Sequence, residues 1–306
     1  MNIRLPDITS GQQALTALPL RWVGMEGITV PLLLEDSGDQ IARLTAKADI
    51  FVSLDKRDAK GIHMSRLFIK LNDILGKNAL NGQTLTKLLH EMVLSQKGLS
   101  QSAKICLKFD VTLRKKALIS NEFGFQSYPV VLSRQKNKEQ IVTTLSLTIP
   151  YSSTCPCSSA LSRQALSDAF AQQFSEPQLS KDAIMQWLSS EQGTIATPHS
   201  QRSFARIELK LLDEELPNLA ALILQFEQVI GTPLQTAVKR EDEQAFAKLN
   251  AANLMFCEDA ARRLKQALEQ KSDIIDYWFK VEHQESLHAH NAVAIDYKET
   301  SYESYI

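Results

Sequence analysis

The sequence predicts an α+β fold, in which antiparallel sheets carry helices packed on one face. The first basis is a set of long segments in which apolar and polar residues alternate, as in strands with one buried and one solvated face. The second is a set of amphipathic helical segments between them, which can cover the buried faces. Long strands with one solvated face are typical of antiparallel sheets. With 306 residues, 44% of them hydrophobic, the chain is long enough for two ordinary domains or one large one.

The first half of the sequence is predicted to contain strands, two helices and further strands. Residues 42–54 alternate so that their Ala, Leu, Ile and Val side chains share one face. A helix follows with an apolar face from Met64 to Leu75 that includes Phe68, and a second helix begins after an Asn-Gly break. Strict alternation returns at 103–113, around 126–133 and at 141–149.

The second half has a roughly similar order of elements. Helices are predicted near 158–173, 182–190, 216–230 and 242–269, and strands at 204–212, 274–282 and 289–297. We therefore predict two similar halves, residues 1–150 and 151–306, although the sequence itself shows no repeat.

The composition excludes several classes of partner. Lys and Arg (34) nearly balance Asp and Glu (35), so there is no long-range positive field to hold a polynucleotide, although a local basic pocket could still hold one small anion. The N-terminal residues lack the pattern of a secretory signal, and no segment is apolar over the length of a bilayer. We expect a cytoplasmic protein that binds neither polynucleotide nor membrane, with its four cysteines as thiols.

Two of the cysteines, Cys155 and Cys157, flank a proline. The ring of Pro156 fixes its own φ and favours an extended conformation at Cys155, so the two sulfur atoms keep a defined relation. Ser158 and Ser159 are candidates to cap the following helix, and a helix N-terminus favours a thiolate that acts as a metal ligand or nucleophile. A tight turn with two small buried residues is the alternative.

Three further polar groups are candidates for a site. Glu285 and His288 are three residues apart in a turn, where they could meet one ligand or form a solvated connection. Residues 239–244, KREDEQ, are typical of a solvated charge run at the start of a helix. Helical spacing places Glu258 near the apolar face of its helix, so its carboxylate needs a partner, either a bound ligand or Arg262.

Six motifs in order make the chain resemble a known family. They are SLDKRDAKGIHMSR, TIPYSSTCPCS, PHSQRS, VKREDEQAF, FCEDAAR and ESLHAHNAVA, and they cover most of the chain. The sequence thereby resembles the prokaryotic type IB GTP cyclohydrolases. The resemblance implies a tunnelling fold of tandem halves, a homotetramer with active sites at subunit boundaries, and hydrolysis of GTP to 7,8-dihydroneopterin triphosphate and formate. This product feeds folate synthesis and, in some organisms, deazaguanine tRNA modification.

The same resemblance implies a metal centre. Cys155, His199 and Glu243 would bind a catalytic divalent ion, Zn²⁺, Mn²⁺ or Fe²⁺, with Glu241 as the alternative to Glu243. Water must add at C8 of guanine, and a bound divalent ion can lower the pKa of water to about 7. Cys157 would be a free active-site thiol beside the substrate.

Roles in substrate binding and proton transfer are implied as well. Glu258 would hold the guanine edge, and Glu285 and His288 would form an acid/base pair near the reacting ring. The implied substrate contacts are His63, Ser65, Arg66, Arg202, Lys239 and Arg240. The cations among them, which are the three arginines and the lysine, are candidates to bind the triphosphate.

The segment between Cys157 and His199 departs from the family pattern. It is short in many members, whereas here it carries an extra stretch over about residues 160–195 that is predicted to form added helices. Two other functions are the alternatives. One is the NADPH-dependent nitrile reductase of the same fold, which the complete metal set argues against. The other is a non-catalytic, metal-dependent purine-binding protein, which would release no formate.

Overall fold

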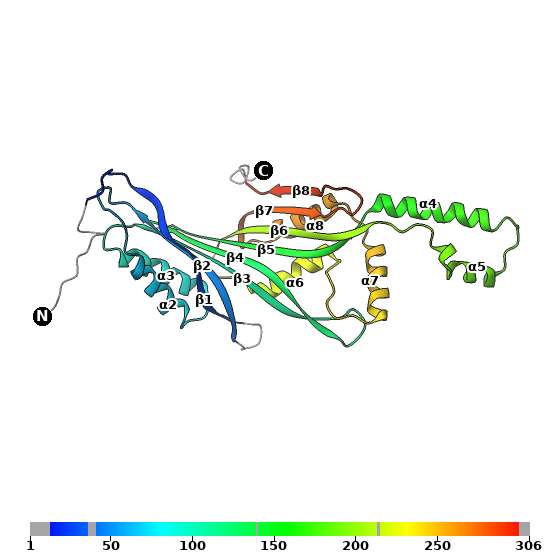
Figure 1. Cartoon of the computed structure of the whole chain (residues 1–306), viewed down its shortest axis with the longest axis horizontal. Coiled ribbons are helices and arrows are strands. Elements are labelled where there is room, and N and C mark those ends of the chain that lie inside the picture. Colours follow the sequence, from blue (N-terminus) through cyan, green and yellow to red (C-terminus); the bar gives the residue numbers. More distant parts are fainter. Residues whose placement is uncertain (1–12, 36–40, 139, 213–214, 300–306) are drawn as a thin grey trace.

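The computed structural model describes residues 13–35, 41–138, 140–212 and 215–299 (Figure 1). Its strands are β1 (Leu20–Glu35), β2 (Ile41–Leu54), β3 (Ser102–Lys116), β4 (Phe123–Asn137), β5 (Gln140–Thr154), β6 (Ser200–Leu211), β7 (Ile274–His283) and β8 (Ala292–Tyr297). Its helices are α2 (Met64–Leu75), α3 (Gly82–Ser95), α4 (Pro156–Gln173), α5 (Lys181–Leu188), the short 3₁₀ helix η1 (Glu191–Gly193), α6 (Leu219–Ile230), α7 (Arg240–Ala252) and α8 (Cys257–Glu269).

The strands of the described residues form one antiparallel sheet of eight, in the order in which they occur in the chain. The α+β class and the antiparallel pairing predicted from alternation are therefore confirmed. The β4–β5 ladder, which runs from Val130↔Leu147 to Asn137↔Gln140, joins strands β1–β4 to strands β5–β8. The predicted division at residue 150 falls inside β5, and it stays a prediction.

The sequence does not predict β1, because its pairing is irregular. Its register with β2 shifts between Leu20 and Val23 and again between Met25 and Ile28, and each shift interrupts the two-residue period. Pro31 also lies in this strand, where it is tolerated because β1 is at the edge of the described sheet. The pattern that reveals the other strands is thus broken here by bulges and proline.

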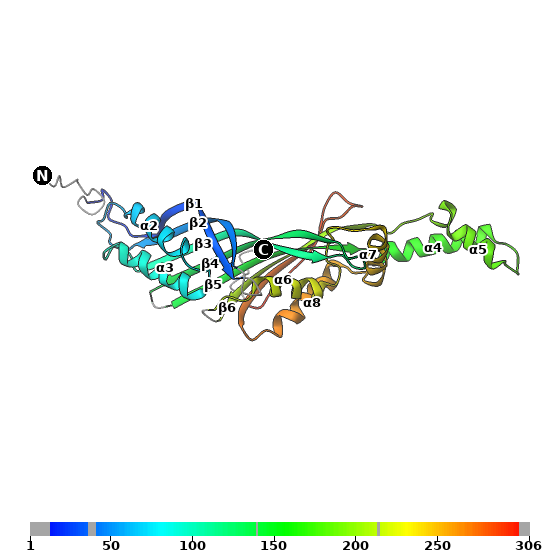
Figure 2. The same cartoon turned by 90° about the horizontal axis from the view of Figure 1, so that it is seen from below.

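Helices α2, α3, α6 and α8 cover one face of the sheet (Figures 1 and 2). Helices α2 and α3 pack against β1, β3 and β4, whereas α6 and α8 pack mainly against β5, β7 and β8. Their apolar side chains and the inward residues of the strands form one continuous core. The other face of the strands presents polar side chains such as Lys47, Lys108 and Arg206, which explains the alternation in the sequence.

The apolar stripe of α2 is narrower than predicted. Leu67, Leu71 and Leu75 are buried, whereas Met64 and Phe68 are 37% and 45% exposed. Phe68 lies at the edge of the stripe, and Met64 is the first residue of the helix. No helix of the described residues combines the length and the apolar character needed to cross a bilayer.

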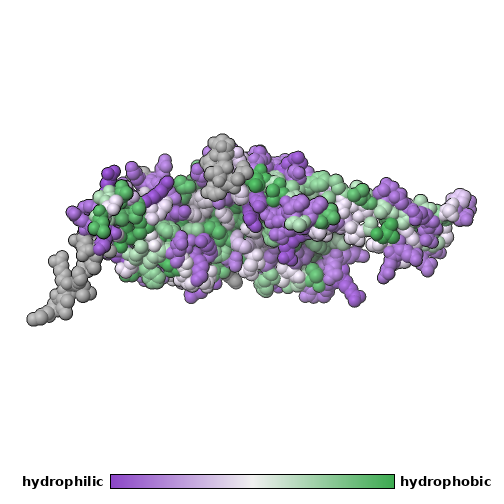
Figure 3. All heavy atoms as spheres, turned by 45° about the horizontal axis from the view of Figure 1, so that its top comes forward, coloured by the Kyte–Doolittle hydropathy of each residue, from purple (hydrophilic) through white to green (hydrophobic). Residues whose placement is uncertain are grey.

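The residues between β5 and β6 form an arm that projects from one end of the sheet (Figure 1). Helix α4 buries none of its residues. Phe170 and Phe174 of this segment pack on Trp187 of α5, with ring centroids 5.7 and 5.8 Å apart. Figure 3 shows hydrophobic residues scattered among hydrophilic ones on the arm, where Leu161 is 72% exposed. The two helices predicted here are confirmed, and they lie outside the main core.

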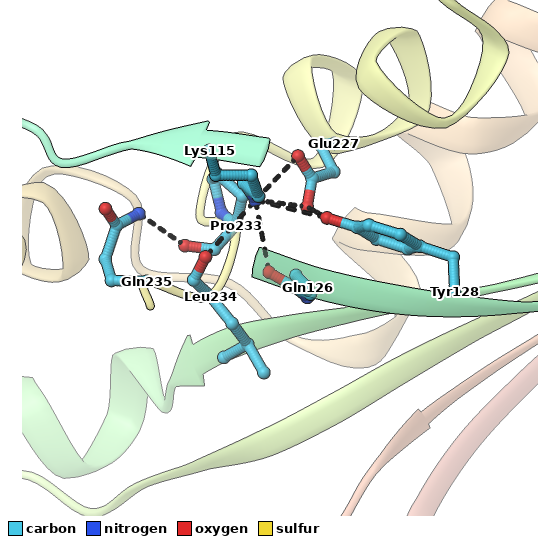
Figure 4. A network of polar contacts seen from close by, with 7 residues as sticks. All are labelled: Lys115, Gln126, Tyr128, Glu227, Pro233, Leu234 and Gln235. Atoms are coloured by element: carbon cyan, nitrogen blue, oxygen red, sulfur yellow. Dashed lines mark hydrogen bonds and ion pairs between the residues drawn. The ribbon is translucent and has the colours of Figure 1, made fainter. Parts of the chain in front are cut away.

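A buried ion pair joins the sheet to α6 (Figure 4). Lys115 Nζ on β3 lies 2.6 and 2.8 Å from the two carboxylate oxygens of Glu227, and the two side chains are 12% and 5% exposed. Tyr128 OH donates to Glu227 Oε1 at 2.6 Å, and Lys115 Nζ also donates to the Leu234 carbonyl at 3.2 Å. Burial and the bond to Glu227 raise the pKa of Tyr128, which keeps its hydroxyl a donor. The network attaches both α6 and the segment that leads to α7.

Replacing Lys115 with Met should lower the free energy of unfolding by about 3–5 kcal/mol, because Glu227 would remain buried without its cation. Urea unfolding measures this change. Lys47→Met is the matched control, since Lys47 is exposed and donates to Thr29 on the polar face. The control should change the free energy by less than about 0.5 kcal/mol. Equal effects of the two substitutions would contradict the structural role of the pair.

Candidate functional site

The end of the β5–β6 ladder brings Cys155 and His199 together. Thr154 pairs with Ser200, so the next residues, Cys155 and His199, face each other where the ladder ends. The Cys155 N–H donates to the His199 carbonyl at 3.3 Å. Cys155 is also the N-cap of α4, and Pro156 is the first helical residue, where a missing N–H is harmless. Backbone pairing therefore holds two of the predicted metal ligands side by side, although the whole arm separates them in sequence.

Ser158 and Ser159 do not cap α4, contrary to the prediction. The helix begins at Pro156, so the N-cap position falls on Cys155. Ser158 Oγ instead accepts a hydrogen bond from the His199 N–H at 3.1 Å, which links the first turn of α4 to the residue before β6. Cys157 lies in that first turn as an exposed, free thiol.

Polar groups hold one side of the His199 ring. Nδ1 lies 3.0 Å from Gln201 Oε1 and 3.8 Å from Glu285 Oε2. The side chains of His199 and Glu285 are only 17% and 15% exposed, so little water competes for these contacts. The predicted metal ligand and the predicted acid/base carboxylate are therefore neighbours.

A cavity of about 150 Å³ lies beside these residues. It contains three of the predicted site residues, Cys155, Glu258 and Glu285, and is lined by Cys155, Gln201, Met255, Phe256, Cys257, Glu258, His283, Glu285 and Ala292. Small-molecule pockets usually have at least about 300 Å³, so one chain encloses only part of a nucleotide here. A larger cavity of about 340 Å³ lies between strands β1–β3 and the start of α6 and is lined by none of the predicted site residues.

His283 is a cavity residue that the sequence analysis does not select. It ends β7 and is 3% exposed. Its Nε2 lies 2.9 Å from Tyr151 OH, and the two rings meet edge to face at 5.7 Å. Burial lowers the pKa of His283 to about 4, so the ring is uncharged at neutral pH. The signal in the sequence is its position at the end of a strand, two residues before Glu285.

Glu258 lies in the first turn of α8, not within a longer helix. Residues 253–256 are not helical, so the region predicted as helical over 242–269 is divided into α7 and α8. The prediction that Glu258 lies near an apolar face is therefore wrong, and its side chain is exposed. Arg262 forms its ion pair with Asp259 at 3.0 Å, and its charge is a minor cause of the lowered pKa of Glu258.

Cys257 donates a hydrogen bond from its thiol to Glu258 Oε2 at 3.2 Å. Burial, together with the bond to Glu258 and its charge, raises the pKa of Cys257 to about 12, so the thiol remains a donor. The backbone N–H of Glu258 and the Cys257 thiol lower the pKa of the Glu258 carboxyl. The cavity wall therefore carries a carboxylate that stays charged at neutral pH.

The loop between β7 and β8 separates the predicted acid/base pair. Glu285 lines the cavity, whereas His288 is exposed and stacks on His290 with ring centroids 4.9 Å apart. Arg202 is exposed on β6, and its carbonyl accepts a hydrogen bond from the N–H of Gln284 at 3.3 Å. Glu285, His288 and Arg202 thus lie at one end of the sheet, but of these three only Glu285 lines the cavity.

The KREDE stretch begins α7 and is clamped by Asp242, whose side chain is fully buried. Asp242 Oδ1 accepts from the N–H groups of Ile119 and Ser120 at 2.7 and 2.9 Å. Oδ2 accepts from the Ser120 hydroxyl at 2.6 Å and from the Lys239 N–H at 2.9 Å. These bonds fix the N-terminus of α7 to the turn between β3 and β4.

The clamp presents the neighbouring charged residues to solvent, away from Cys155. Glu241, Glu243 and Arg240 are exposed, and Lys239 pairs with Glu122 at 2.7 Å. The other end of α7 leads to Met255, whose N–H donates to the Thr154 carbonyl. Since α7 has 13 residues and Glu243 is the fourth, Glu243 lies about 14 Å along the helix from the end that leads to Met255.

His63, Ser65 and Arg66 lie at the opposite end of the sheet. His63 N–H donates to Gln96 Oε1 at 2.8 Å, and Arg66 Nη1 donates to the Ser95 carbonyl at 3.0 Å, beside the start of β3. Strand β5 begins at this end and reaches Cys155 after 15 residues, a span of about 45–50 Å. These residues cannot reach the Cys155 cavity within one chain.

The donors in one chain fit part of a metal centre. Among the described residues, no three His, Cys, Asp or Glu side chains gather closely enough to hold a metal ion. Cys155 and His199 are nevertheless neighbours and offer sulfur and nitrogen donors of the kind that Zn²⁺ and Fe²⁺ accept. These two side chains fit part of the donor set of a divalent ion, and no third His, Cys, Asp or Glu of the described residues completes it.

The fold is that of the tunnelling-fold proteins. It is similar to uricase from Arthrobacter globiformis, with a TM-score of 0.52 and 6% identity over 92% of this chain and 93% of that one. A hyper-thermostable mutant of uricase gives a TM-score of 0.52 and 7% identity over 93% and 96% of the two chains. At this identity the likeness shows the fold alone, and it confirms the fold predicted from the resemblance.

Sequence relatives define the family. A family model described as Type I GTP cyclohydrolase folE2 matches residues 5–294. GTP cyclohydrolase FolE2 of Pseudoalteromonas atlantica is 64% identical over 98% of both chains, and that of Hahella chejuensis is 53% identical over 96% of both. The chain therefore belongs to the type I GTP cyclohydrolase FolE2 family, a family of hydrolases, as the resemblance predicted.

Asp242→Asn should destabilise the protein in a way that depends on pH. Burial alone would raise the pKa of Asp242, but the bonds from Ser120, Lys239 and Ile119 outweigh it and hold the pKa well below its ordinary value of 3.8. A depressed folded-state pKa gives stability that is complete above the unfolded-state pKa and is lost as the pH falls. The free energy of unfolding of the unsubstituted protein should exceed that of Asp242→Asn by the full amount at pH 7, and this difference should shrink below about pH 4.

Urea midpoints of the two proteins between acidic and neutral pH measure this difference. Asp168→Asn is the matched control, because Asp168 is exposed on the arm, and it should cause little change at any pH. A loss of stability in Asp242→Asn that is constant over this range would contradict the clamp.

Proposed function

We propose that the chain hydrolyses GTP to 7,8-dihydroneopterin triphosphate and formate at the cavity beside Cys155. The observation that carries the proposal is the end of the β5–β6 ladder, where Cys155 and His199 adjoin a cavity that also contains Glu258 and Glu285. Opening the five-membered ring of guanine requires water to add at C8 and protons to move. The four residues offer metal donors, a base-binding carboxylate and a proton carrier.

Glu258 recognises guanine. The base presents two adjacent donors, N1–H and the 2-amino group, and one carboxylate accepts from both at once. The carboxyl of Glu258 is kept ionised by its own N–H and by the Cys257 thiol, and it lines the cavity. Adenine lacks this pair of donors, so ATP would leave the carboxylate unpaired and should be rejected strongly.

Cys155 and His199, together with Glu243 of another copy of the chain, would hold a divalent ion, Zn²⁺, Mn²⁺ or Fe²⁺. When bound, such an ion supplies a Lewis acid that makes water nucleophilic near neutral pH. Glu285, at the cavity wall beside His199, takes up or delivers protons at its carboxylate, with His288 of the same loop as its partner. Cys157 contributes an exposed thiol at the mouth of the site.

The site is completed between copies of the chain, which assemble as a homotetramer. Two facts support this: the motif with Arg66 lies about 45–50 Å from Cys155 in one chain, and the cavity is too small for a whole nucleotide. Of the cations proposed for the triphosphate, Arg66, Lys239 and Arg240 would then come from other copies, and Arg202 from the same one. The enzyme acts on free GTP in the cytoplasm and not on a polynucleotide.

The purified protein with added Mn²⁺ or Zn²⁺ should release formate from GTP and not from ATP. Chelation should abolish the reaction, and Cys155→Ala should slow formate release at least about 100-fold, because loss of a Lewis acid costs several kcal/mol of transition-state stabilisation. Cys106→Ala is the matched control, since Cys106 lies within β3 and outside the cavity, and it should keep its activity. Binding of metal and GTP without formate would overturn the proposed reaction.

Mixing two inactive variants tests the shared site. Cys155→Ala and Arg66→Ala should each be inactive alone, whereas co-expressed chains should recover about a quarter of full activity, because random pairing leaves that share of sites intact. Light scattering shows whether the mixed chains form tetramers. If tetramers contain both variants and activity does not recover at any ratio, the proposed shared site is contradicted. Either the whole site then lies in one chain, or Cys155 or Arg66 has no role in it.

A further inference from the structure

Gln201 connects His199 to two buried serines. Its Oε1 lies 3.0 Å from His199 Nδ1, and its Nε2 donates to Ser153 Oγ at 2.8 Å. Ser153 Oγ is in turn 2.7 Å from Ser203 Oγ, and both serines are 0% exposed. A line of polar contacts thus runs from the cavity wall into the β5–β6 ladder.

We propose that Gln201 is a positioning residue for His199: it holds the imidazole with its proton on Nδ1 and so reserves Nε2 for a divalent ion. The inference rests on the proposed metal site and deepens it. Gln201 lines the cavity but is not itself needed as a ligand. Its effect is exerted through the ring of His199.

Two acceptor oxygens facing Nδ1 decide which nitrogen carries the proton. An amide oxygen accepts hydrogen bonds and cannot donate, and Glu285 Oε2 adds a second acceptor at 3.8 Å. Nδ1 therefore donates, and the lone pair remains on Nε2, the nitrogen free to bind a metal. Glu285 alone does not suffice, because 3.8 Å is too long for a hydrogen bond.

In the observed orientation Ser153 Oγ receives the NH₂ group of the Gln201 amide, and the amide oxygen meets the ring. A reversed amide would turn its NH₂ group toward Nδ1, which favours the proton on Nε2 and blocks metal binding there. Ser153 Oγ accepts a hydrogen bond from Gln201 Nε2 and also contacts Ser203 Oγ. In this orientation each of these polar groups therefore has a hydrogen-bond partner. A ring held this way loses little freedom when the ion binds.

Titration of the metal-free protein with Co²⁺, followed by its absorption spectrum, tests the proposal without an activity assay. Gln201→Met, which has similar length and no acceptor, should bind Co²⁺ about 10- to 100-fold more weakly. Gln201→Glu keeps an acceptor oxygen and should bind more tightly than Gln201→Met. The thiolate-to-cobalt band of Cys155 should persist in both. Gln235→Met is the matched control, since Gln235 donates to the Pro233 carbonyl outside the cavity, and it should bind as the unsubstituted protein does.

Thermal unfolding of the metal-free variants distinguishes positioning from folding, and it should be unchanged. If Gln201→Met binds Co²⁺ as tightly as the unsubstituted protein while His199→Ala binds none, the role of Gln201 is overturned and the metal site stands. Unchanged affinity in His199→Ala would instead overturn the proposed metal site. If Gln201→Met fails to fold, the Co²⁺ affinity of Gln201→Glu is the test. Co²⁺ binding by Gln201→Glu that is as weak as that of His199→Ala would overturn the proposal.

Discussion

The backbone ladder between β5 and β6 is the interaction on which the site depends. It runs without a register shift from Thr143↔Leu211 to Thr154↔Ser200. Because each pair fixes the next, Cys155 and His199 must meet where the ladder ends, whatever the chain between them does. The cost of closing a connection rises only slowly with its length. The arm of α4 and α5 is therefore compatible with an intact site, although it interrupts the sequence between the two residues.

Buried polar contacts fix the other parts of the proposed site. The Lys115–Glu227 pair attaches α6 and the following segment to the sheet, and Asp242 clamps the start of α7 to the β3–β4 turn. A side chain at Gly124 would overlap Thr236 of that segment, so the backbones can approach closely only with glycine there. These contacts leave Glu243 exposed and away from the cavity of its own chain, as the proposed site between copies requires.

Much of the fold could be predicted from the sequence, because the sheet has one buried and one solvated face. Apolar and polar residues therefore alternate along its strands. Strand β1 could not be predicted, since bulges and Pro31 break the period. The sequence places Glu258 wrongly because one helical period continues through residues 253–256, where the chain leaves the helix before α8 begins. The proximity of Cys155 and His199 followed from the resemblance and not from spacing, since it depends on a distant strand pairing. The role proposed for Glu243 depends on a contact between copies of the chain, and such a contact leaves no local pattern in the sequence.

Anomalous diffraction from a crystal of the metal-loaded enzyme tests the central claim most directly. One metal peak is expected at the end of the β5–β6 ladder, about 2.3 Å from Cys155 Sγ and about 2.0–2.1 Å from His199 Nε2 if the ion is Zn²⁺. A carboxylate ligand from a neighbouring copy of the chain is expected as well. A peak elsewhere, or one that Cys155 and His199 do not share, would contradict the account.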